Sequence, residues 1–189
     1  MEPVSYTDGR VTIRQLEVSD LDADLAAKDD EQIDWLWEPG QREAWEAMTP
    51  GEQREHARRT LQEAHDAFGP GPKWSFAVDT ASDTYVAYVD CDLANDKVPA
   101  GQANVAYSAH PSHRGCGYVS SAVRLLLRFL EEQTTATEAH ILVDSENVAS
   151  LRVAHSVGAV ATAQWTDDSK RTMIRHVVKL ARGGADAHA

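Results

Sequence analysis

Cysteine, long apolar runs and targeting signals are what this sequence lacks. Its two cysteines, Cys91 and Cys116, cannot build a disulfide framework and fit a reducing compartment. No apolar stretch approaches the roughly 20 residues that span a bilayer. The opening residues, MEPVSYTDGR, contain neither the basic nor the apolar segment of a secretion signal. These absences exclude a disulfide-stapled secreted domain and predict a cytoplasmic protein without a membrane partner.

Positive charge is also scarce: 18 Lys and Arg face 30 Asp and Glu, for a net charge of −12. This balance argues against general nucleic-acid binding, which needs a basic surface. The deficit lies in residues 1–96, with 22 acidic and 8 basic side chains, whereas residues 97–189 hold 8 acidic and 10 basic. From Lys97 through Leu130 there is no acid at all. Such a window suits an anionic ligand, although chance clustering would also produce it.

The order of predicted elements indicates one mixed α/β domain with helices on both faces of a single sheet. The clearest helix start is Thr49-Pro50-Gly51-Glu52, a capping box with proline at the first helical position. Strands are predicted by alternation over 10–16, 74–78, 84–93, 103–109, 139–143, 159–165 and 171–180. Helices are predicted over 19–28 (capped by Ser19 or Asp20), 31–48 (broken at Pro39-Gly40), 49–68, 118–130 and 145–159 (closed by Gly158).

The segment HPSHRGCG, between a predicted strand and a predicted helix, has the layout of a phosphate cradle. Gly115 and Gly117 allow the backbone to turn and present N–H groups, and the following helix adds its positive end. A P-loop would need Gly-Lys-Ser/Thr, and a dinucleotide fingerprint a third small residue; neither is present. The alternative is that both glycines only make a tight strand-to-helix turn.

HPSHRGCGYVSSAVRLLLRFL, followed after one strand by DSENVASLRVAHSVGA, resembles the GCN5-related N-acetyltransferase (GNAT) superfamily. The closest similarity is to its ribosomal-protein N-acetyltransferase (RimJ/RimL-like) branch, with Gly-x-Gly-Tyr and Asn-x-x-Ser-x-Arg patterns. The resemblance implies one acetyltransferase domain over residues 1–182, with an acceptor-side helical insert at about 19–68 and a cofactor-binding core at about 103–158. Residues 183–189 would be a flexible tail. It also implies a mostly antiparallel sheet that is splayed at the cofactor site.

The cofactor implied by the resemblance is acetyl-coenzyme A. The backbone of residues 114–118 should hold its pyrophosphate, and the strand end at residues 108–110 should pair with its pantetheine arm. Asn147 and Ser150 should lie beside that arm and the thioester, although Asn147 would also serve as a plain helix cap. The implied cofactor-binding residues are Ser108, Ala109, His110, Arg114, Gly115, Cys116, Gly117, Tyr118, Asn147 and Ser150.

The usual acid and base of the family are missing from this chain. Ala154 stands where many relatives have a tyrosine acid, which leaves Ser150 as the nearest candidate acid and Tyr118 as the second. Asn104 stands where the histone-modifying branch has its glutamate base. One strand earlier, period two places Tyr88, Asp90 and Asp92 on one face. Desolvation and mutual repulsion would raise the pKa of these two carboxyls, and Asp90 is the preferred base; ordinary solvated strand acids are the alternative.

The acceptor is predicted to be an amine. Trp35 or Trp37 of the insert would form the floor of the acceptor pocket, and Tyr88 and Asp92 would lie beside the acceptor. Tryptophan more often packs in a core, which is the alternative. The acidic N-terminal half favours a cationic small molecule, such as an antibiotic or polyamine, or a peptide N-terminus. His110 and His113 are too few ligands for a metal. Alternatives are a non-catalytic acyl-CoA sensor of the same fold, or transfer of longer acyl groups or to a hydroxyl. A homodimer is possible.

Overall fold

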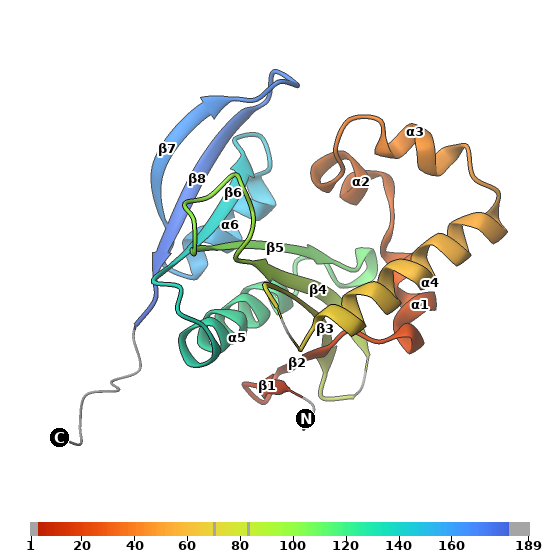
Figure 1. Cartoon of the computed structure of the whole chain (residues 1–189), viewed down its shortest axis with the longest axis horizontal. Coiled ribbons are helices and arrows are strands. Elements are labelled where there is room, and N and C mark those ends of the chain that lie inside the picture. The colour runs from red at the N-terminus through yellow and green to blue at the C-terminus, as the bar shows by residue number, and fades with distance from the viewer. Residues whose placement is uncertain (1–3, 70, 83, 182–189) are drawn as a thin grey trace.

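The computed structural model describes residues 4–69, 71–82 and 84–181, which form one eight-stranded sheet flanked by helices (Figure 1). The tail predicted over 183–189 lies outside the described residues. The strands are β1 (Ser5–Thr7), β2 (Val11–Gln15), β3 (Lys73–Thr80), β4 (Tyr85–Asp92), β5 (Ala103–Ala109), β6 (Glu138–Asp144), β7 (Val160–Thr166) and β8 (Thr172–Lys179). The helices are α1 (Leu21–Ala27), α2 (Asp30–Leu36), α3 (Gln41–Glu46), α4 (Pro50–Ala67), α5 (Tyr118–Gln133) and α6 (Val148–Ser156). Short 3-10 turns, η1 (Val18–Asp20) and η2 (Pro111–His113), precede α1 and follow β5.

The sheet has the order β1-β2-β3-β4-β5-β6-β8-β7 and is antiparallel at every step except one. That exception is the parallel pair β5–β6, which is bonded in register only at Ala103–Ala139 and Asn104–His140. Beyond these two pairs the strands run on to Ala109 and Asp144 without pairing to each other. The predicted fold class, a mostly antiparallel sheet that splays apart at its middle, is therefore confirmed.

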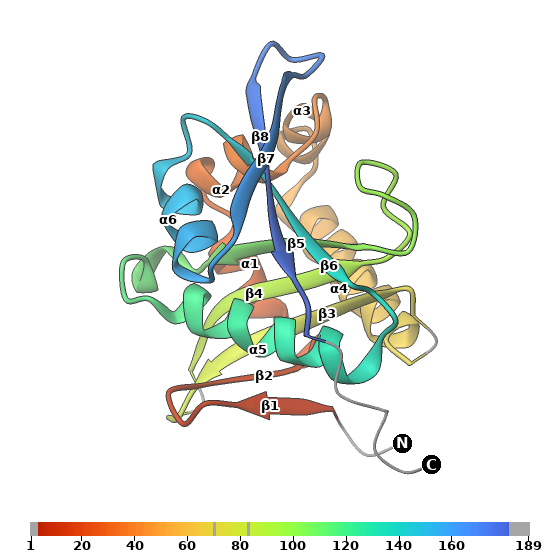
Figure 2. The ribbon, with the colours of Figure 1, turned by 90° about the vertical axis from the view of Figure 1, so that its left-hand side faces the viewer.

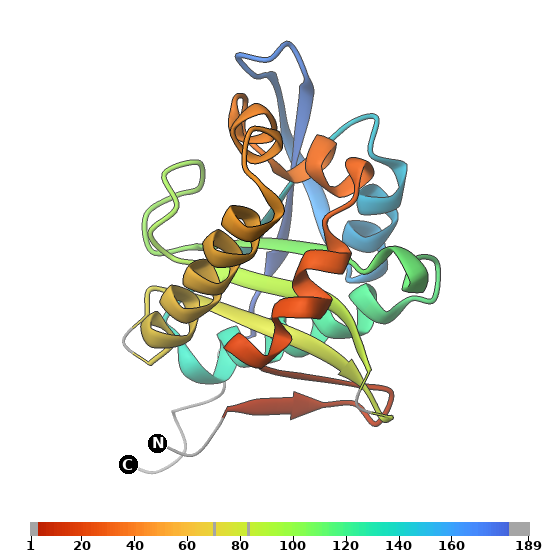
Figure 3. The ribbon, with the colours of Figure 1, turned by 90° about the vertical axis from the view of Figure 1, so that its right-hand side faces the viewer.

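Helices cover both faces of the sheet. Figure 2 shows α5 lying across one face, and Figure 3, from the opposite side, shows α1 and α4 across the other. Side chains at helical spacing, Leu126, Phe129 and Leu130, bury the inner face of α5 against the strands. Within the described ranges, no helix combines the length and the apolar character needed to cross a bilayer.

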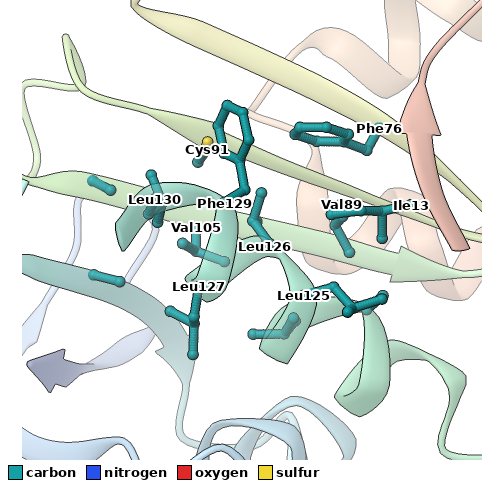
Figure 4. Close-up of a cluster of buried hydrophobic side chains, with 14 of the residues drawn as sticks. Ile13, Phe76, Val89, Cys91, Val105, Leu125, Leu126, Leu127, Phe129 and Leu130 are labelled. Carbon is teal, nitrogen blue, oxygen red and sulfur yellow. The ribbon is translucent and has the colours of Figure 1, made fainter. Parts of the chain in front are cut away.

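The three phenylalanines belong to one core cluster, and Figure 4 shows two of them, Phe76 and Phe129. The ring of Phe76 on β3 packs edge-to-face against Phe68 and against Phe129 of α5, with both centroid distances 5.1 Å. Each of these side chains is at most 5 % exposed, and burying one contributes about 1.5–3 kcal/mol to stability. This cluster fixes α5, and with it the loop that precedes the helix, against β2–β5.

Most local predictions are confirmed. Thr49 accepts from the backbone N–H of Glu52, whose carboxylate accepts from that of Thr49, so the capping box is real. Gly40, at φ 87°, separates α2 from α3, and Gly158, at φ 79°, follows α6. The prediction that a Ser19 or Asp20 side chain caps α1 is wrong. The Asp20 carboxylate instead accepts hydrogen bonds from the Arg14 guanidinium and from the backbone N–H of Glu17. The short strand β1 was not predicted.

Candidate active site

The gap between β5 and β6 opens into a cavity of about 500 Å³. Its walls come from β5, the glycine loop, the start of α5, the end of β6, α6 and helix α2 of the insert. Residues that line it include Gln32, Trp35, Leu36, Tyr107, Ser108, Ala109, Arg114, Gly115, Gly117, Tyr118, Asp144, Asn147 and Ser150. Segments that are more than a hundred residues apart in sequence therefore meet around the place where the sheet splits.

Alternation along β5 determines which backbone groups face this gap. The N–H of His110 bonds to the carbonyl of Val86 on β4, and the β4–β5 register pairs Ser108 with Tyr88. In an antiparallel ladder every second residue bonds to the partner strand, so the N–H groups of Tyr107 and Ala109 point to the opposite side, toward β6. Of the strand-end residues 108–110 predicted to pair with the pantetheine arm, it is Ala109 whose amide faces the gap.

The glycine loop leads into the N-terminus of α5 as a cradle of backbone groups. Gly115 and Gly117 both have φ 76°, a left-handed conformation that glycine adopts without strain. Gly117 is the N-cap of a 16-residue helix whose first N–H groups have no intrahelical partner. A Cβ added at Gly115 would meet nothing within 4 Å, so the space beside the loop is open. This arrangement fits a phosphate group.

The glycine loop lies in an acid-free stretch of the sequence, but in the fold acidic side chains from elsewhere in the chain lie beside it. Arg114 makes a bidentate pair with Asp29, at 2.6 and 2.7 Å, and reaches Glu31 at 2.8 Å. This guanidinium holds the pKa of Asp29 below its usual value. Arg10, just before β2, donates to the carbonyl of Cys116, and its guanidinium lies 5.2 Å from the ring centroid of Tyr118. In the fold, Arg114 from the acid-free segment is therefore paired with acids at the start of α2. Arg10, from outside that segment, supplies a second cation beside the loop.

Two hydroxyl groups meet on the floor of this cavity. The phenol oxygen of Tyr107 lies 2.9 Å from Ser150 Oγ and 3.1 Å from the Ser150 carbonyl oxygen. Burial raises the pKa of Tyr107 to about 12. Asn147 is the N-cap of α6, and its Oδ1 accepts from the Ser150 N–H at 2.9 Å, so the cap interpretation is confirmed. Ser150 is thereby held through both its side chain and its backbone.

A second cavity, of about 660 Å³, lies between the helical insert and the sheet. It meets the first cavity at Gln32, Leu36 and Ser108, which line both. Aromatic rings form part of its wall: Trp37 packs edge-to-face on Trp45 at 5.6 Å, and Trp45 on His56 at 6.2 Å. The Lys28 ammonium, paired with Asp24, lies 6.0 Å from the Trp45 ring centroid. This wall already accommodates a cation.

A buried acid lies behind the second cavity. Tyr88 and Ser75 line that cavity and are 3.0 Å apart through their hydroxyls. The Tyr88 hydroxyl donates to Asp90 at 2.7 Å, and Lys73 approaches the same carboxylate at 3.3 Å. Burial raises the pKa of Asp90 despite the lysine. Asp92 faces the loop after β4, where it accepts from the backbone N–H of Ala94.

The structure distributes the predicted site residues over both cavities. The first is lined by Trp35, Ser108, Ala109, Arg114, Gly115, Gly117, Tyr118, Asn147 and Ser150. The second is lined by Trp37, Tyr88 and again Ser108. Asp90, Asp92, His110 and Cys116 line neither of these two cavities. Trp35 and Trp37, two residues apart on α2 and its end, therefore serve different cavities.

Residues 10–160 match the family model described as an acetyltransferase (GNAT) domain. The chain belongs to this family. The GNAT match covers most of the sequence and contains both cavities' principal segments, from β2 to the start of β7. The protein is accordingly an N-acetyltransferase, and acetyl-CoA is the acyl donor that the family uses.

Solved structures support the GNAT fold. A ribosomal-protein-S5-alanine acetyltransferase from Vibrio fischeri is 15% identical with a TM-score of 0.74, covering 94% of this chain and 97% of that one. RimL, an alpha-N-protein acetyltransferase in complex with coenzyme A, is 13% identical with a TM-score of 0.75, covering 95% and 98%. The microcin C7 self-immunity acetyltransferase MccE, in complex with acetyl-CoA and AMP, is 11% identical with a TM-score of 0.67, covering 92% and 93%. At these identities the likeness concerns the fold. No curated protein matches the chain by sequence.

The sequence analysis did not identify two residues that lie at these cavities, Tyr107 and Arg10. Tyr107 and Ser150 are 43 positions apart, and Arg10 and Cys116 are 106 apart, so neither contact leaves a local pattern. The alternation of β5 was a usable signal for Tyr107, because it puts this side chain on the face opposite Ser108. Nothing in the sequence around Arg10 indicates its contact with the glycine loop.

Proposed function

We propose that this protein moves the acetyl group of acetyl-CoA by direct attack of a primary amine, with the donor in the first cavity and the amine in the second. The observation that carries the proposal is that the two cavities meet at Ser108, on the strand whose free amides face the gap. Donor and acceptor can then react in place without a covalent enzyme intermediate, and their juxtaposition supplies much of the rate.

In the first cavity, the backbone of residues 114–118 and the N-terminus of α5 bind the pyrophosphate. The open space beside Gly115 and the unpaired first-turn amides support this assignment. The free amides of Tyr107 and Ala109 pair with the pantetheine arm and polarise the thioester carbonyl. Arg10, beside Cys116 and Tyr118, adds positive charge near the loop.

In the second cavity, the acceptor is a cationic small molecule or the N-terminus of a peptide. The aromatic wall of Trp37 and Trp45 supports a cationic acceptor, because aromatic faces attract ammonium groups. The acids near this wall are partnered, Asp24 by Lys28 and Asp90 by Lys73. The preference for a cation therefore rests on the rings more than on the net acidity of the N-terminal half.

Asp90 acts as the base through Tyr88. An incoming ammonium donates a proton to the Tyr88 oxygen, and the Tyr88 hydroxyl proton passes to the Asp90 carboxylate, 2.7 Å away. The neutral nitrogen then forms a bond to the carbonyl carbon, the C–S bond breaks with its electron pair staying on sulfur, and the second proton of the nitrogen passes to solvent as the amide forms. The raised pKa of Asp90 supports this role, since a base works best when its pKa lies near the working pH.

Release of free thiol from acetyl-CoA tests the proposal, with a panel of polyamines, amino-bearing antibiotics, arylalkylamines and short peptides with free N-termini. At least one cationic amine should accelerate release well above hydrolysis. Tight binding of coenzyme A without thiol release across the whole panel would contradict the proposed transfer and favour an acyl-CoA sensor.

Asp90→Asn and Tyr88→Phe test the proton route. Both should lower kcat/KM about tenfold or more and remove the rise of activity with pH that an ionising Asp90 produces. Asp22→Asn, at an exposed position of α1 that pairs with Arg54, should leave the pH profile unchanged. An unaltered profile in Asp90→Asn would exclude Asp90 as the base.

A further inference from the structure

The hydroxyl pair of Tyr107 and Ser150 lies in the first cavity and is not used by the proton route through Asp90. Both side chains line that cavity, and their oxygens are 2.9 Å apart. Ser150 is fixed by the Asn147 cap, and Tyr107 by its place in the middle of the β4–β5 ladder, opposite Val89. Ala154, one helical turn beyond Ser150, is fully buried and carries no polar group. Of the two α6 hydroxyls that line this cavity, Ser156 donates to Ser120 at the start of α5, and Ser150 is the one bonded to β5.

The direction of the hydrogen bond between Tyr107 and Ser150 decides where the Ser150 hydroxyl hydrogen points. Each hydroxyl has one hydrogen and can accept with its lone pairs. If the phenol donates to the Ser150 carbonyl oxygen, 3.1 Å away, Ser150 Oγ donates to the phenol in turn, and the serine hydrogen points at Tyr107. If Tyr107 donates to Ser150 Oγ, the serine hydrogen is free to turn into the cavity. Negative charge in the cavity favours this second arrangement, because it places the free hydrogen toward that charge.

The acidity of the groups limits what can be transferred. Tyr107 has a pKa of about 12, whereas an ordinary thiol has a pKa of about 8.5. Moving the phenol proton to a thiolate would be unfavourable by more than three powers of ten in the equilibrium constant. A serine hydroxyl is a still weaker acid. Both groups therefore keep their protons, and the pair acts through hydrogen bonds.

We propose that Tyr107 is a positioning residue for acetyl transfer: its phenol donates to Ser150 Oγ and aims the Ser150 hydroxyl hydrogen at the sulfur of the leaving thiolate. The inference rests on the proposed function. As the C–S bond breaks, sulfur keeps the electron pair and receives the hydrogen bond of Ser150. The acceptor's proton leaves by the Tyr88–Asp90 route, and sulfur takes its own proton from solvent when the thiol is released.

The first test uses coenzyme A alone and does not depend on turnover. Ultraviolet titration of the thiolate in the complex should give a thiol pKa about one unit lower in the wild type than in Tyr107→Phe. Ser150→Ala should match the Tyr107→Phe value, and the double variant should show no further change. Tyr6→Phe, which removes a phenol bonded to Glu132 on the surface, is the matched control and should behave as the wild type.

Kinetics provide the second readout. Tyr107→Phe should lower kcat about tenfold and leave the KM for acetyl-CoA within twofold, with no additivity in the double variant. The loss should shrink with an acetyl donor whose leaving group is more acidic, such as p-nitrophenyl acetate. Should the phenylalanine variant not fold, Tyr107→Met replaces it.

An unchanged thiol pKa in Tyr107→Phe, or fully additive kinetic effects with Ser150→Ala, would overturn the inference. Absence of thiol release in the wild type would overturn the proposed function instead. The coenzyme A titration distinguishes the two failures, because it reports on the hydroxyl pair whether or not an acceptor is found.

Discussion

The two cavities of this acetyltransferase are built from different materials. The first is largely a backbone construction: a split in the sheet, two left-handed glycines and the start of α5. The second is a side-chain construction, in which rings from α2, α3 and α4 face polar groups of β3 and β4. The comparison teaches that the first cavity, where we propose the donor binds, depends on a few backbone conformations, whereas the second, proposed for the acceptor, depends on how α1, α2, α3 and α4 pack.

The largest expected effect comes from disturbing the backbone of the first cavity. Gly115→Ala should weaken coenzyme A binding about thirtyfold, because a non-glycine residue at φ 76° costs about 1–2 kcal/mol and shifts the loop amides. Gly101→Ala is the matched control, since Gly101 has φ 77° and equally open surroundings but lies outside both cavities. Calorimetry on both variants checks this. Equal Kd values for the two would remove the backbone cradle from the account.

Truncating a ring should affect only the second cavity. Trp37→Ala is expected to raise the KM of a cationic amine about tenfold, because the ring contributes about 1–2 kcal/mol to its binding. The Kd of coenzyme A should stay within twofold. Trp165→Ala on β7, where the ring contacts Arg175, serves as the control. If Trp37→Ala weakened both ligands equally, the two cavities would not be separable.

The junction where β5 and β6 part should be sensitive to pH. His140, in the last parallel pair, is 2 % exposed, and burial lowers its pKa even though Glu138 Oε2 lies 3.3 Å from its Nε2. In the unfolded chain His140 takes up a proton with a pKa near 6.5, whereas in the folded state it does so only at lower pH. The free energy of unfolding therefore falls as the pH drops below 6.5 toward the lowered pKa of the folded state. At pH 5.5 this loss is at most about 1.4 kcal/mol, the value reached when the folded state binds no proton.

Urea unfolding at pH 5.5 and 7.5 measures this loss. In His140→Phe the difference between the two pH values should shrink, because the titrating group has been removed, while His176, whose pKa burial also lowers, still contributes. His155→Gln, at an exposed position of α6, should retain the wild-type difference. An undiminished difference in His140→Phe would show that His140 is not the sensitive group.

The smallest expected effect tests the link between the cavities. Asp29→Asn keeps an N-cap for α2 but removes the ion pair with Arg114. The freed guanidinium should tighten coenzyme A about threefold, while looser docking of α2 should raise the acceptor KM by a similar factor; the pair is partly exposed, which limits both changes. Asp30→Asn, in an exposed pair with Arg42, is the control. Changes of the same sign at both cavities would contradict this link.

The sequence predicted the first cavity better than the second for a physical reason. Gly115, Gly117 and the Asn147 cap act through local backbone geometry, which leaves a signature within a few residues. The contact of Tyr107 with Ser150, and those of Arg10 and Arg114 with their partners, depend on tertiary packing of distant segments. The period of β4 correctly placed Tyr88 and Asp90 on one face, but not the bond of Asp90 to Lys73 across to β3.

The alternation of β5 has a consequence for how this protein can change. Ser108 and His110 turn their N–H groups toward β4, while Tyr107 and Ala109 turn theirs toward the gap, where we propose that the donor binds. Deleting a single residue within the strand would exchange the two sets, so that the N–H groups now turned toward β4 would face the gap. Substitutions can therefore accumulate along this strand, whereas changes of length are confined to the loops at its ends.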